Sequence, residues 1–267
     1  MQRVGVSQRK ACSLVGLWRG TCRYQAQDNR EEEMVRQRLR ALAETRPRFG
    51  SPRLGALLRR EMGVINHKRV ERLYAQEGLQ LPKRSKRLRR RWSRVMPLAM
   101  PTGPRQRWSL DFIHDSLRDG RKFRALTVVD DFSRECPAIT VDISISGQRV
   151  TRVLDWLADT TDLPQVLVLD NGPEFTSKAM FCWAEQRGVK LHFTDPGRPT
   201  QNAYIESFNG KFRDECLNRH WFKDLSEAAR MIEEWRQDYN LARPHSSLGY
   251  LAPETFRQQH ELALSVV

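Results

Sequence analysis

Three carboxylates in the second half of the chain have the residue types needed for metal-assisted phosphodiester chemistry. Asp111 falls in the middle of an extended segment, Asp170 ends a short apolar run, and Glu206 follows Asp170 after 35 intervening residues. Carboxylates brought together repel one another unless a cation lies between them, and hard oxygen ligands suit Mg²⁺ or Mn²⁺. Two such ions could activate an attacking water or hydroxyl and stabilise the leaving oxygen of a phosphodiester. On spacing alone, three unrelated surface acids remain the better interpretation, because the chain has 32 Asp and Glu residues.

The segments that carry these carboxylates predict a mixed α/β sheet with helices packed on it. Three extended segments in a row, with Asp119-Gly120 as a hairpin signal between the first two, predict a three-stranded meander. The apolar run over 165–170 is typical of a strand buried on both faces, and Asn171-Gly172 turns the chain after it. Helices and strands then alternate, which indicates an α/β fold. The expected strands lie within 107–117, 122–133, 135–145, 165–170 and 189–193, and the expected helices over 146–160, 177–187 and from Thr200 toward Trp221.

The last of these helices would carry Glu206 beside an apolar stripe. At 100° per residue, four polar side chains fall within about 60° of one another: Asn202, Glu206, Asn209 and Arg213. The neighbouring stripe consists of Ile205, Phe208, Phe212 and Cys216. Docking of this stripe on the sheet could bring Glu206 near the strands that carry the two aspartates. Arg213 could then hold a phosphate backbone beside them.

The distribution of charge separates a basic front from a slightly acidic back. The 267 residues carry 46 Lys and Arg against 32 Asp and Glu, a net charge of +14. Residues 1–107 have 27 basic and 8 acidic side chains, net +19, which leaves −5 for residues 108–267. This asymmetry favours a nucleic-acid-binding region joined to something else. No run reaches the roughly 20 apolar residues of a membrane span, and five Cys without a C-x-x-C pair favour a reducing cytosol over a disulfide framework.

The densest basic stretch covers residues 83–94 and reads KRSKRLRRRWSR, with eight basic residues in twelve. So many like charges need open solvent or an anionic partner. A phosphate-binding linker is the favoured interpretation, because both flanks have the pattern of folded segments, and a solvated tether is the alternative. The residues expected to bind phosphates are Lys83, Arg84, Lys86, Arg87, Arg89, Arg90 and Arg91.

Helical patterns before this stretch predict a helix-turn-helix. A helix of about 15 residues follows the capping pair Asp28 and Glu31. A second begins at Ser51-Pro52 and ends at Met62-Gly63, and a third is capped by Asn66 and ends near Gly78. Three basic side chains on the third helix lie where a recognition helix meets phosphates or base edges: Lys68, Arg69 and Arg72. Helical hairpins with basic outer faces are common, so this segment alone supports DNA binding and a plain hairpin equally.

The apolar faces of the front helices can also be predicted. The expected inward positions are Met34, Val35, Leu39 and Leu42 on the first of the three helices, and Ala11, Leu14 and Val15 on an earlier short helix within 7–18.

Five stretches together resemble a known family: WSLDF around Asp111, FRALTVVDDFSREC at 123–136, LDNGPEF at 169–175, PGRPTQNAYIESFNGKFRDECLN at 196–218 and YNLARPHSSLGYLAPETF at 239–256. They are similar to the OrfB transposases of the insertion-sequence-three family, whose catalytic domain resembles retroviral integrase, and the similarity extends forward through 65–81. The resemblance implies a ribonuclease-H-like fold, DNA strand cleavage and joining, and a triad of Asp111, Asp170 and Glu206 that binds two Mg²⁺ or Mn²⁺ ions per active site. It places Arg213 at the family's basic position. Leu169 departs from the family, which often has a small polar residue there.

Several neighbours of the triad have competing interpretations. Asn171 and Glu174 are expected to line the site behind the metal ligands. Asp130 and Asp131 are rival carboxylates, although a turn is the favoured interpretation of this pair. His245 could contact DNA, but we expect it to tie down the tail.

Three residues with bulky or absent side chains complete these expectations. Trp221 and Trp235 are expected in the core rather than as platforms for base stacking. Gly210, inside a helix where glycine costs about 1 kcal/mol, suggests close packing or a close backbone approach.

The sequence therefore predicts an α/β chain whose ribonuclease-H-like integrase core, with a mixed five-stranded sheet, follows an all-α helix-turn-helix region. The expected divisions are a DNA-binding region at 1–81, a basic linker at 82–104, the core at 105–222 and a C-terminal helix and tail at 223–267. The expected function is that of a transposase that cleaves and joins DNA at insertion-sequence ends by two-metal hydrolysis and transesterification. The alternatives are a nuclease without joining activity and a DNA-binding regulator from a decayed element.

The expected partners are DNA, further copies of the chain on paired element ends, and an OrfA product or an OrfA–OrfB fusion, with no membrane. The expected location is the bacterial cytoplasm, at the nucleoid.

Overall fold

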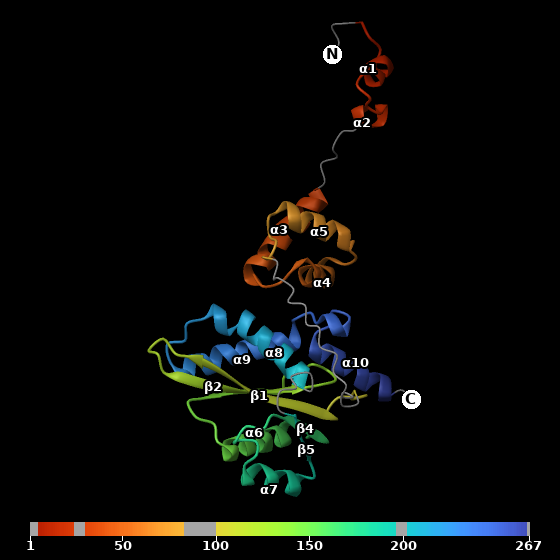
Figure 1. Cartoon of the computed structure of the whole chain (residues 1–267). Coiled ribbons are helices and arrows are strands. Elements are labelled where there is room, and N and C mark those ends of the chain that lie inside the picture. Colours follow the sequence, from red (N-terminus) through yellow and green to blue (C-terminus); the bar gives the residue numbers. More distant parts are fainter. Residues whose placement is uncertain (1–4, 24–29, 83–99, 196–201, 266–267) are drawn as a thin grey trace.

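The computed structural model describes residues 5–23, 30–82, 100–195 and 202–265. The helices within them (Figure 1) are α1 (Gln8–Leu14), α2 (Arg19–Arg23), α3 (Arg30–Thr45), α4 (Ser51–Met62), α5 (His67–Gln76), α6 (Gly147–Thr160), α7 (Lys178–Arg187), α8 (Ala203–Glu215), α9 (Leu225–Leu241) and α10 (Pro253–Ser265). The strands are β1 (Arg107–Ser116), β2 (Lys122–Asp130), β3 (Ala138–Asp142), β4 (Val166–Leu169) and β5 (Lys190–Phe193). Short 3-10 turns occupy Leu217–Arg219 and Ser246–Leu248. No helix in the described ranges is both long and apolar enough to cross a membrane.

A mixed five-stranded sheet organises the second half of the chain, as predicted. The strand order is β3-β2-β1-β4-β5. The first three strands form the expected antiparallel meander, whereas β4 pairs parallel with β1 and β5 pairs parallel with β4. Parallel neighbours need a crossover, and α6 and α7 supply the two crossovers.

Helices cover both faces of this sheet. Figure 1 shows α6 and α7 on one face and α8 and α9 on the other. Successive strand residues point to opposite faces, so Leu126 and Val128 of β2 enter the core beneath α6 and α7, while Phe123 and Ala125 enter the core beneath α8 and α9. The predicted apolar stripe on α8 is buried in this second core.

The front helices α3, α4 and α5 have a core of their own, and α4 and α5 form the predicted helix-turn-helix. The Asn66 side chain caps α5 by accepting a 2.9 Å hydrogen bond from the Lys68 N–H. Gly63 and Gly78 end α4 and α5 with positive φ angles of 82° and 68°, values that glycine adopts without steric cost. The expected capping residue Asp28 lies outside the described residues.

Several predicted inward positions are wrong. On α1, Cys12 is buried while Leu14 and Val15 are exposed, and on α3 Met34 is exposed because the buried positions are Val35, Leu39 and Leu42. The helix predicted to run toward Trp221 ends at Glu215.

Trp221 is 87% exposed rather than part of the core. Its neighbour Phe222 takes the inward place, packs edge-on against Phe123 with ring centroids 5.8 Å apart, and accepts a hydrogen bond from the Arg118 N–H at its carbonyl. Trp235 does lie against the core, as expected.

Arginines of the front helices fasten this region to the sheet domain. Arg46 forms a two-pronged ion pair with Asp238 of α9. Arg60 donates to the Ala242 carbonyl at 2.7 Å and to the Tyr250 carbonyl at 2.8 Å. These contacts join residues more than 180 positions apart, and Figure 1 shows α4 on the side of the sheet that α8 and α9 cover.

Candidate active site

The sheet places two of the predicted carboxylates side by side. The parallel pairing of β1 and β4 includes Ser109 opposite Val168, and Asp111 and Asp170 each lie two residues further along their strands. Parallel neighbours advance together, and residues two apart share a face of the sheet. Asp111 and Asp170 are therefore neighbours on adjacent strands and lie on the same face of the sheet, at the end of β4.

The electrostatics of Asp111 reveal the neighbouring acids. The pKa of this carboxyl is raised to about 6, mainly by burial and also by the negative charges of Asp170 and Glu206, against the opposing effect of hydrogen bonds from the Phe112 N–H and from Asn209. Both hydrogen bonds are 2.8 Å long. Electrostatic interactions weaken with distance, so the effect of Asp170 and Glu206 on Asp111 indicates that the three predicted acids lie in the same part of the structure. Asp170 and Glu206 are themselves exposed.

Helix α8 is pinned to the strand that carries Asp111. Asn209 donates to Asp111 Oδ2 and accepts at its own Oδ1 from the Thr127 hydroxyl at 3.0 Å. Thr127 sits opposite Asp111 in the pairing of β1 and β2, and its hydroxyl lies 3.1 Å from the Asp111 carbonyl oxygen. Sequence reasoning missed Thr127, which only the hairpin register could have identified.

The donor set fits a hard divalent cation in chemistry. It consists of carboxylate oxygens, and the charges of Asp170 and Glu206 contribute, after burial, to the raised pKa of Asp111. Within the described ranges, no group of three or more His, Cys, Asp or Glu side chains is gathered closely enough to hold an ion. A cation would therefore have to draw the side chains of the exposed pair, Asp170 and Glu206, toward Asp111.

The other predicted residues of α8 and the turn after β4 have defined partners. Arg213 donates to the His114 carbonyl at 2.8 Å, beside the end of β1. Asn202 is buried, and its Oδ1 has no hydrogen-bond partner among the described residues. Asn171 donates to the Thr194 carbonyl at 2.7 Å, and Glu174 pairs with Arg124. Burial raises the pKa of Glu174, but the Arg124 hydrogen bond, a backbone hydrogen bond and the Arg124 charge together lower the pKa below its usual range.

The basic residues predicted on α5 are not equally available. Arg69 pairs with Glu31 at 2.8 Å and Arg72 pairs with Glu32 at 2.7 Å, both across to α3, whereas Lys68 is exposed. The predicted phosphate-binding residues of the linker, Lys83, Arg84, Lys86, Arg87, Arg89, Arg90 and Arg91, lie outside the described residues.

The rival carboxylates Asp130 and Asp131 hold a turn, in line with the favoured interpretation. Asp130 accepts from the N–H groups of Phe132 and Ser133 at 2.9 and 2.8 Å. Asp131 accepts from the Ser109 hydroxyl at 2.7 Å and pairs with Arg107. Both carboxylates are buried, so we assign them a structural role in the turn.

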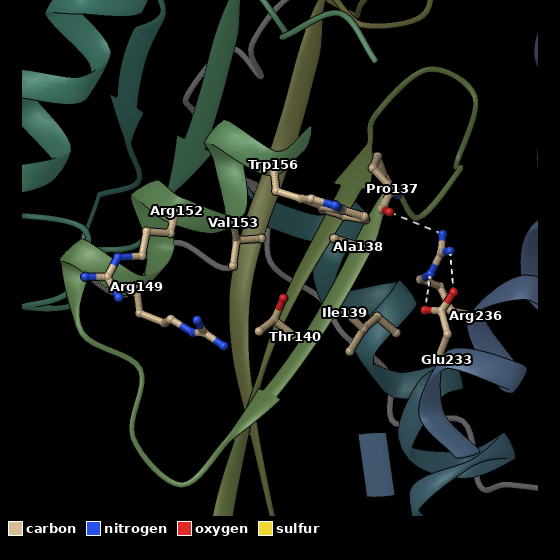
Figure 2. A pocket seen from close by; sticks show the side chains of 10 residues that line it. All are labelled: Pro137, Ala138, Ile139, Thr140, Arg149, Arg152, Val153, Trp156, Glu233 and Arg236. Atoms are coloured by element: carbon tan, nitrogen blue, oxygen red, sulfur yellow. Dashed lines mark hydrogen bonds and ion pairs between the residues drawn. The ribbon is translucent and has the colours of Figure 1, made fainter. Parts of the chain in front are cut away.

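A separate hollow of about 320 Å³ lies at the β3 edge of the sheet and contains none of the three predicted catalytic acids. Figure 2 shows Val153 and Trp156 of α6 facing Ala138, Ile139 and Thr140 of β3, with Arg236 bonded to Glu233 and to the Pro137 carbonyl. Its lining offers no free carboxylate cluster for metal chemistry, so it is not the candidate site.

Comparisons with known proteins agree with this architecture. Two models of the integrase core domain match residues 101–199 and 187–253, and a model of an HTH-like domain matches residues 28–87. The insertion element IS407 uncharacterized 31.7 kDa protein of Burkholderia multivorans is 50% identical over 259 residues, covering 97% of this chain and 93% of that protein. The insertion element IS476 uncharacterized 39.2 kDa protein of Xanthomonas euvesicatoria is 46% identical over 256 residues, covering 96% of this chain and 74% of that protein.

Among solved structures, a chain of the simian T-cell lymphotropic virus intasome in complex with PP2A regulatory subunit B56 gamma superposes with a TM-score of 0.54. It is 14% identical, and the match covers 82% of this chain and 73% of that one, so the likeness is one of fold.

Proposed function

Because this chain belongs to the insertion-sequence-three family of transposases, we propose that it cleaves DNA at the ends of an insertion element and joins the exposed ends to target DNA. The chain is an integrase-type polynucleotidyl transferase. The proposal assigns both reactions to one active site, formed by Asp111, Asp170 and Glu206. The observation that carries it is the pairing of β1 with β4, which puts Asp111 and Asp170 on one face of the sheet, together with the hydrogen bond to Asp111 from Asn209 on the helix that carries Glu206.

In this proposal the three carboxylates hold two Mg²⁺ or Mn²⁺ ions. When bound, the ions would lower the pKa of the attacking water or 3′-hydroxyl and stabilise the leaving oxygen. Asn209 and Thr127 fix the Asp111 carboxylate and its strand against α8, so one ligand is oriented before DNA arrives. The Gly172 N–H does the same for Asp170, by donating to its Oδ1 at 3.0 Å.

The reaction proceeds in two displacements at phosphorus. Water first attacks the phosphodiester at the element end, the bond to the 3′ oxygen breaks, and that oxygen leaves as a 3′-hydroxyl. The 3′-hydroxyl then attacks a target phosphodiester, losing its proton as the new bond forms and a target 3′ oxygen departs. Carboxylates act as ligands throughout, so no covalent bond between protein and DNA forms. Arg213 and Asn202 would face the DNA backbone from α8.

The front region would supply affinity for DNA. Lys68 is exposed and ready to contact phosphates, whereas Arg69 and Arg72 would have to leave Glu31 and Glu32. The basic linker would add a strongly salt-dependent contribution. We further propose that several copies act together on paired element ends, and that an OrfA product or fusion contributes end recognition.

One assay separates this proposal from a nuclease that cuts without joining. The purified chain is incubated with Mn²⁺ and labelled DNA that ends in the element's terminal repeat. Joined products of increased length support the transposase, whereas nicked strands alone favour the nuclease. A regulator from a decayed element would bind the DNA and leave it intact.

A further inference from the structure

A polar groove lies where the front helices meet α8. It has a volume of about 660 Å³, and its walls include Arg48 and Arg53 from the start of α4 and the loop before it. Ser207, Gly210 and Lys211 of α8 form the opposite wall. The Arg46 and Arg60 contacts described above join the same two regions, which makes the groove a built feature of the fold.

The groove has more positive than negative charge. Glu215 is bonded by Arg243 at 2.6 and 2.7 Å and by Arg53 at 3.2 Å, and Asp214 lies 3.4 Å from Arg48. Three guanidinium groups therefore contact these two carboxylates, and Lys211 adds a further positive charge.

Lys211 adds a cation that no acid matches. In the part of the chain that the structure describes, no carboxylate lies within ion-pair distance of its ammonium, whose hydrogen-bond partner is His245 Nε2 at 2.9 Å. Burial, together with the nearby charges of Arg243 and Arg53, lowers the pKa of Lys211 to about 8. An anion bound here would relieve the repulsion between the Lys211 ammonium and the neighbouring guanidinium groups. Through this bond to Lys211, His245 links the C-terminal segment to α8, as expected.

Gly210 opens into the same groove. Among the described residues no atom lies within 4 Å of the place where a Cβ would stand, so their packing does not require glycine. The prediction of close internal packing at this position is therefore wrong, and the close approach of an outside backbone remains. Glycine inside a helix lowers the stability of the fold, so its presence here favours a role in binding a molecule from outside the chain.

We propose that this groove seats a segment of DNA sugar-phosphate backbone, with a phosphate held by Lys211 and Arg53 and the strand passing over Gly210. The inference rests on the proposed function and adds a DNA path to it. Gly210 follows Glu206 by four residues, about 6 Å along the helix axis, so a strand in the groove runs beside the candidate active site. The hydroxyls of Ser207 and Ser246 line the groove and can donate to phosphate oxygens. The groove residue Pro82 is followed directly by the basic stretch that begins at Lys83.

The test uses the full chain and a short labelled duplex, with affinity measured by fluorescence anisotropy at several salt concentrations. Lys211→Gln should weaken binding roughly 5- to 10-fold and reduce the slope of log affinity against log salt by about 0.9, the value for one lost phosphate contact. Lys211→Arg should retain most of the affinity. Lys178→Gln, the same charge change on α7 across the sheet, is the matched control and should leave the slope unchanged.

Gly210→Ala keeps the test decisive even if Lys211→Gln were to misfold. An alanine here meets no atom of the described ranges within 4 Å, so the melting temperature should rise while the affinity for DNA falls. Wild-type affinity in both Gly210→Ala and Lys211→Gln would overturn the groove. If wild-type protein joined DNA ends normally in that case, the proposed function would stand without the groove. If the variants lost affinity but wild-type protein produced neither nicks nor joints, the groove would stand and the proposed chemistry would fall.

Discussion

Replacing Asp111 with asparagine should stabilise the metal-free protein while abolishing its chemistry. The pKa of Asp111 is raised from 3.8 to about 6, a shift of roughly 2 units. At 1.36 kcal/mol per unit, the ionised carboxylate costs the folded state about 3 kcal/mol at pH 8. Asparagine removes that charge and can still accept from the Phe112 N–H. Its amide nitrogen would meet the Asn209 amide, which must turn over, so we expect a net gain of about 1 to 2 kcal/mol in the free energy of unfolding.

The pH dependence distinguishes this explanation from a general effect of the substitution. Between pH 4 and pH 6 the folded wild type binds a proton that the unfolded chain has lost. The contribution of Asp111 to stability is therefore fully present at low pH and is lost as the pH rises through about 6. The change in stability caused by Asp111→Asn should therefore be about 2 to 3 kcal/mol less favourable at pH 4 than above pH 7, so that the variant is no more stable than the wild type at pH 4.

Urea denaturation in EDTA at a series of pH values measures this difference. Asp159→Asn, an exposed aspartate on α6, is the matched control and should change stability by less than about 0.5 kcal/mol. Adding Mg²⁺ should then raise the stability of the wild type but not that of Asp111→Asn, because a ligand that binds only the folded state stabilises it. An Asp111→Asn protein that was no more stable than wild type at pH 8, or a gain independent of pH, would refute the reasoning.

Two further substitutions test the packing around α8 and α9. Arg243→Ala should lower the free energy of unfolding in urea by about 3 kcal/mol, because it leaves the buried Glu215 with only Arg53 as partner. The control Arg230→Ala breaks an exposed ion pair and should lower it by less than about 1 kcal/mol. Equal losses would contradict the assignment of the buried pair. Trp235→Ala should cost about 3 kcal/mol because its ring packs among other aromatic rings, while Trp221→Ala at the exposed position should stay within about 0.5 kcal/mol. A large loss at Trp221 would show that its exposure is wrong.

The fold could be predicted well because its signals are local. Apolar runs, hairpin residues and helix caps such as Asn66 each act within a few residues, and the structure confirms the Asn66 cap. The neighbourhood of Asp111 and Asp170 then depends on β4 joining β1, which no local pattern specifies.

The register and the long-range contacts could not be predicted. A two-residue turn at Asp119-Gly120 would pair Asp111 with Val128, but the longer turn closed by the bond from the Leu117 N–H to the Arg121 carbonyl pairs it with Thr127. A change of register by one residue turns every side chain of the strand to the other face of the sheet. The hydrogen bond between Thr127 and Asn209 of α8 therefore could not be predicted from the sequence. The groove depends on pairs such as Arg53 with Glu215, 162 positions apart, for which the sequence contains no spacing signal.

The most direct test of the proposed active site is strand joining by Glu206→Gln. Wild-type protein, Glu206→Gln and the exposed control Glu234→Gln are incubated with Mn²⁺ and DNA that ends in the terminal repeat, and nicked and joined strands are separated on a denaturing gel. If Glu206 is a ligand of the shared metal site, Glu206→Gln should produce neither product while binding the DNA as tightly as wild type, and Glu234→Gln should match wild type in both respects. Joined products from Glu206→Gln at the wild-type rate would contradict the proposed triad.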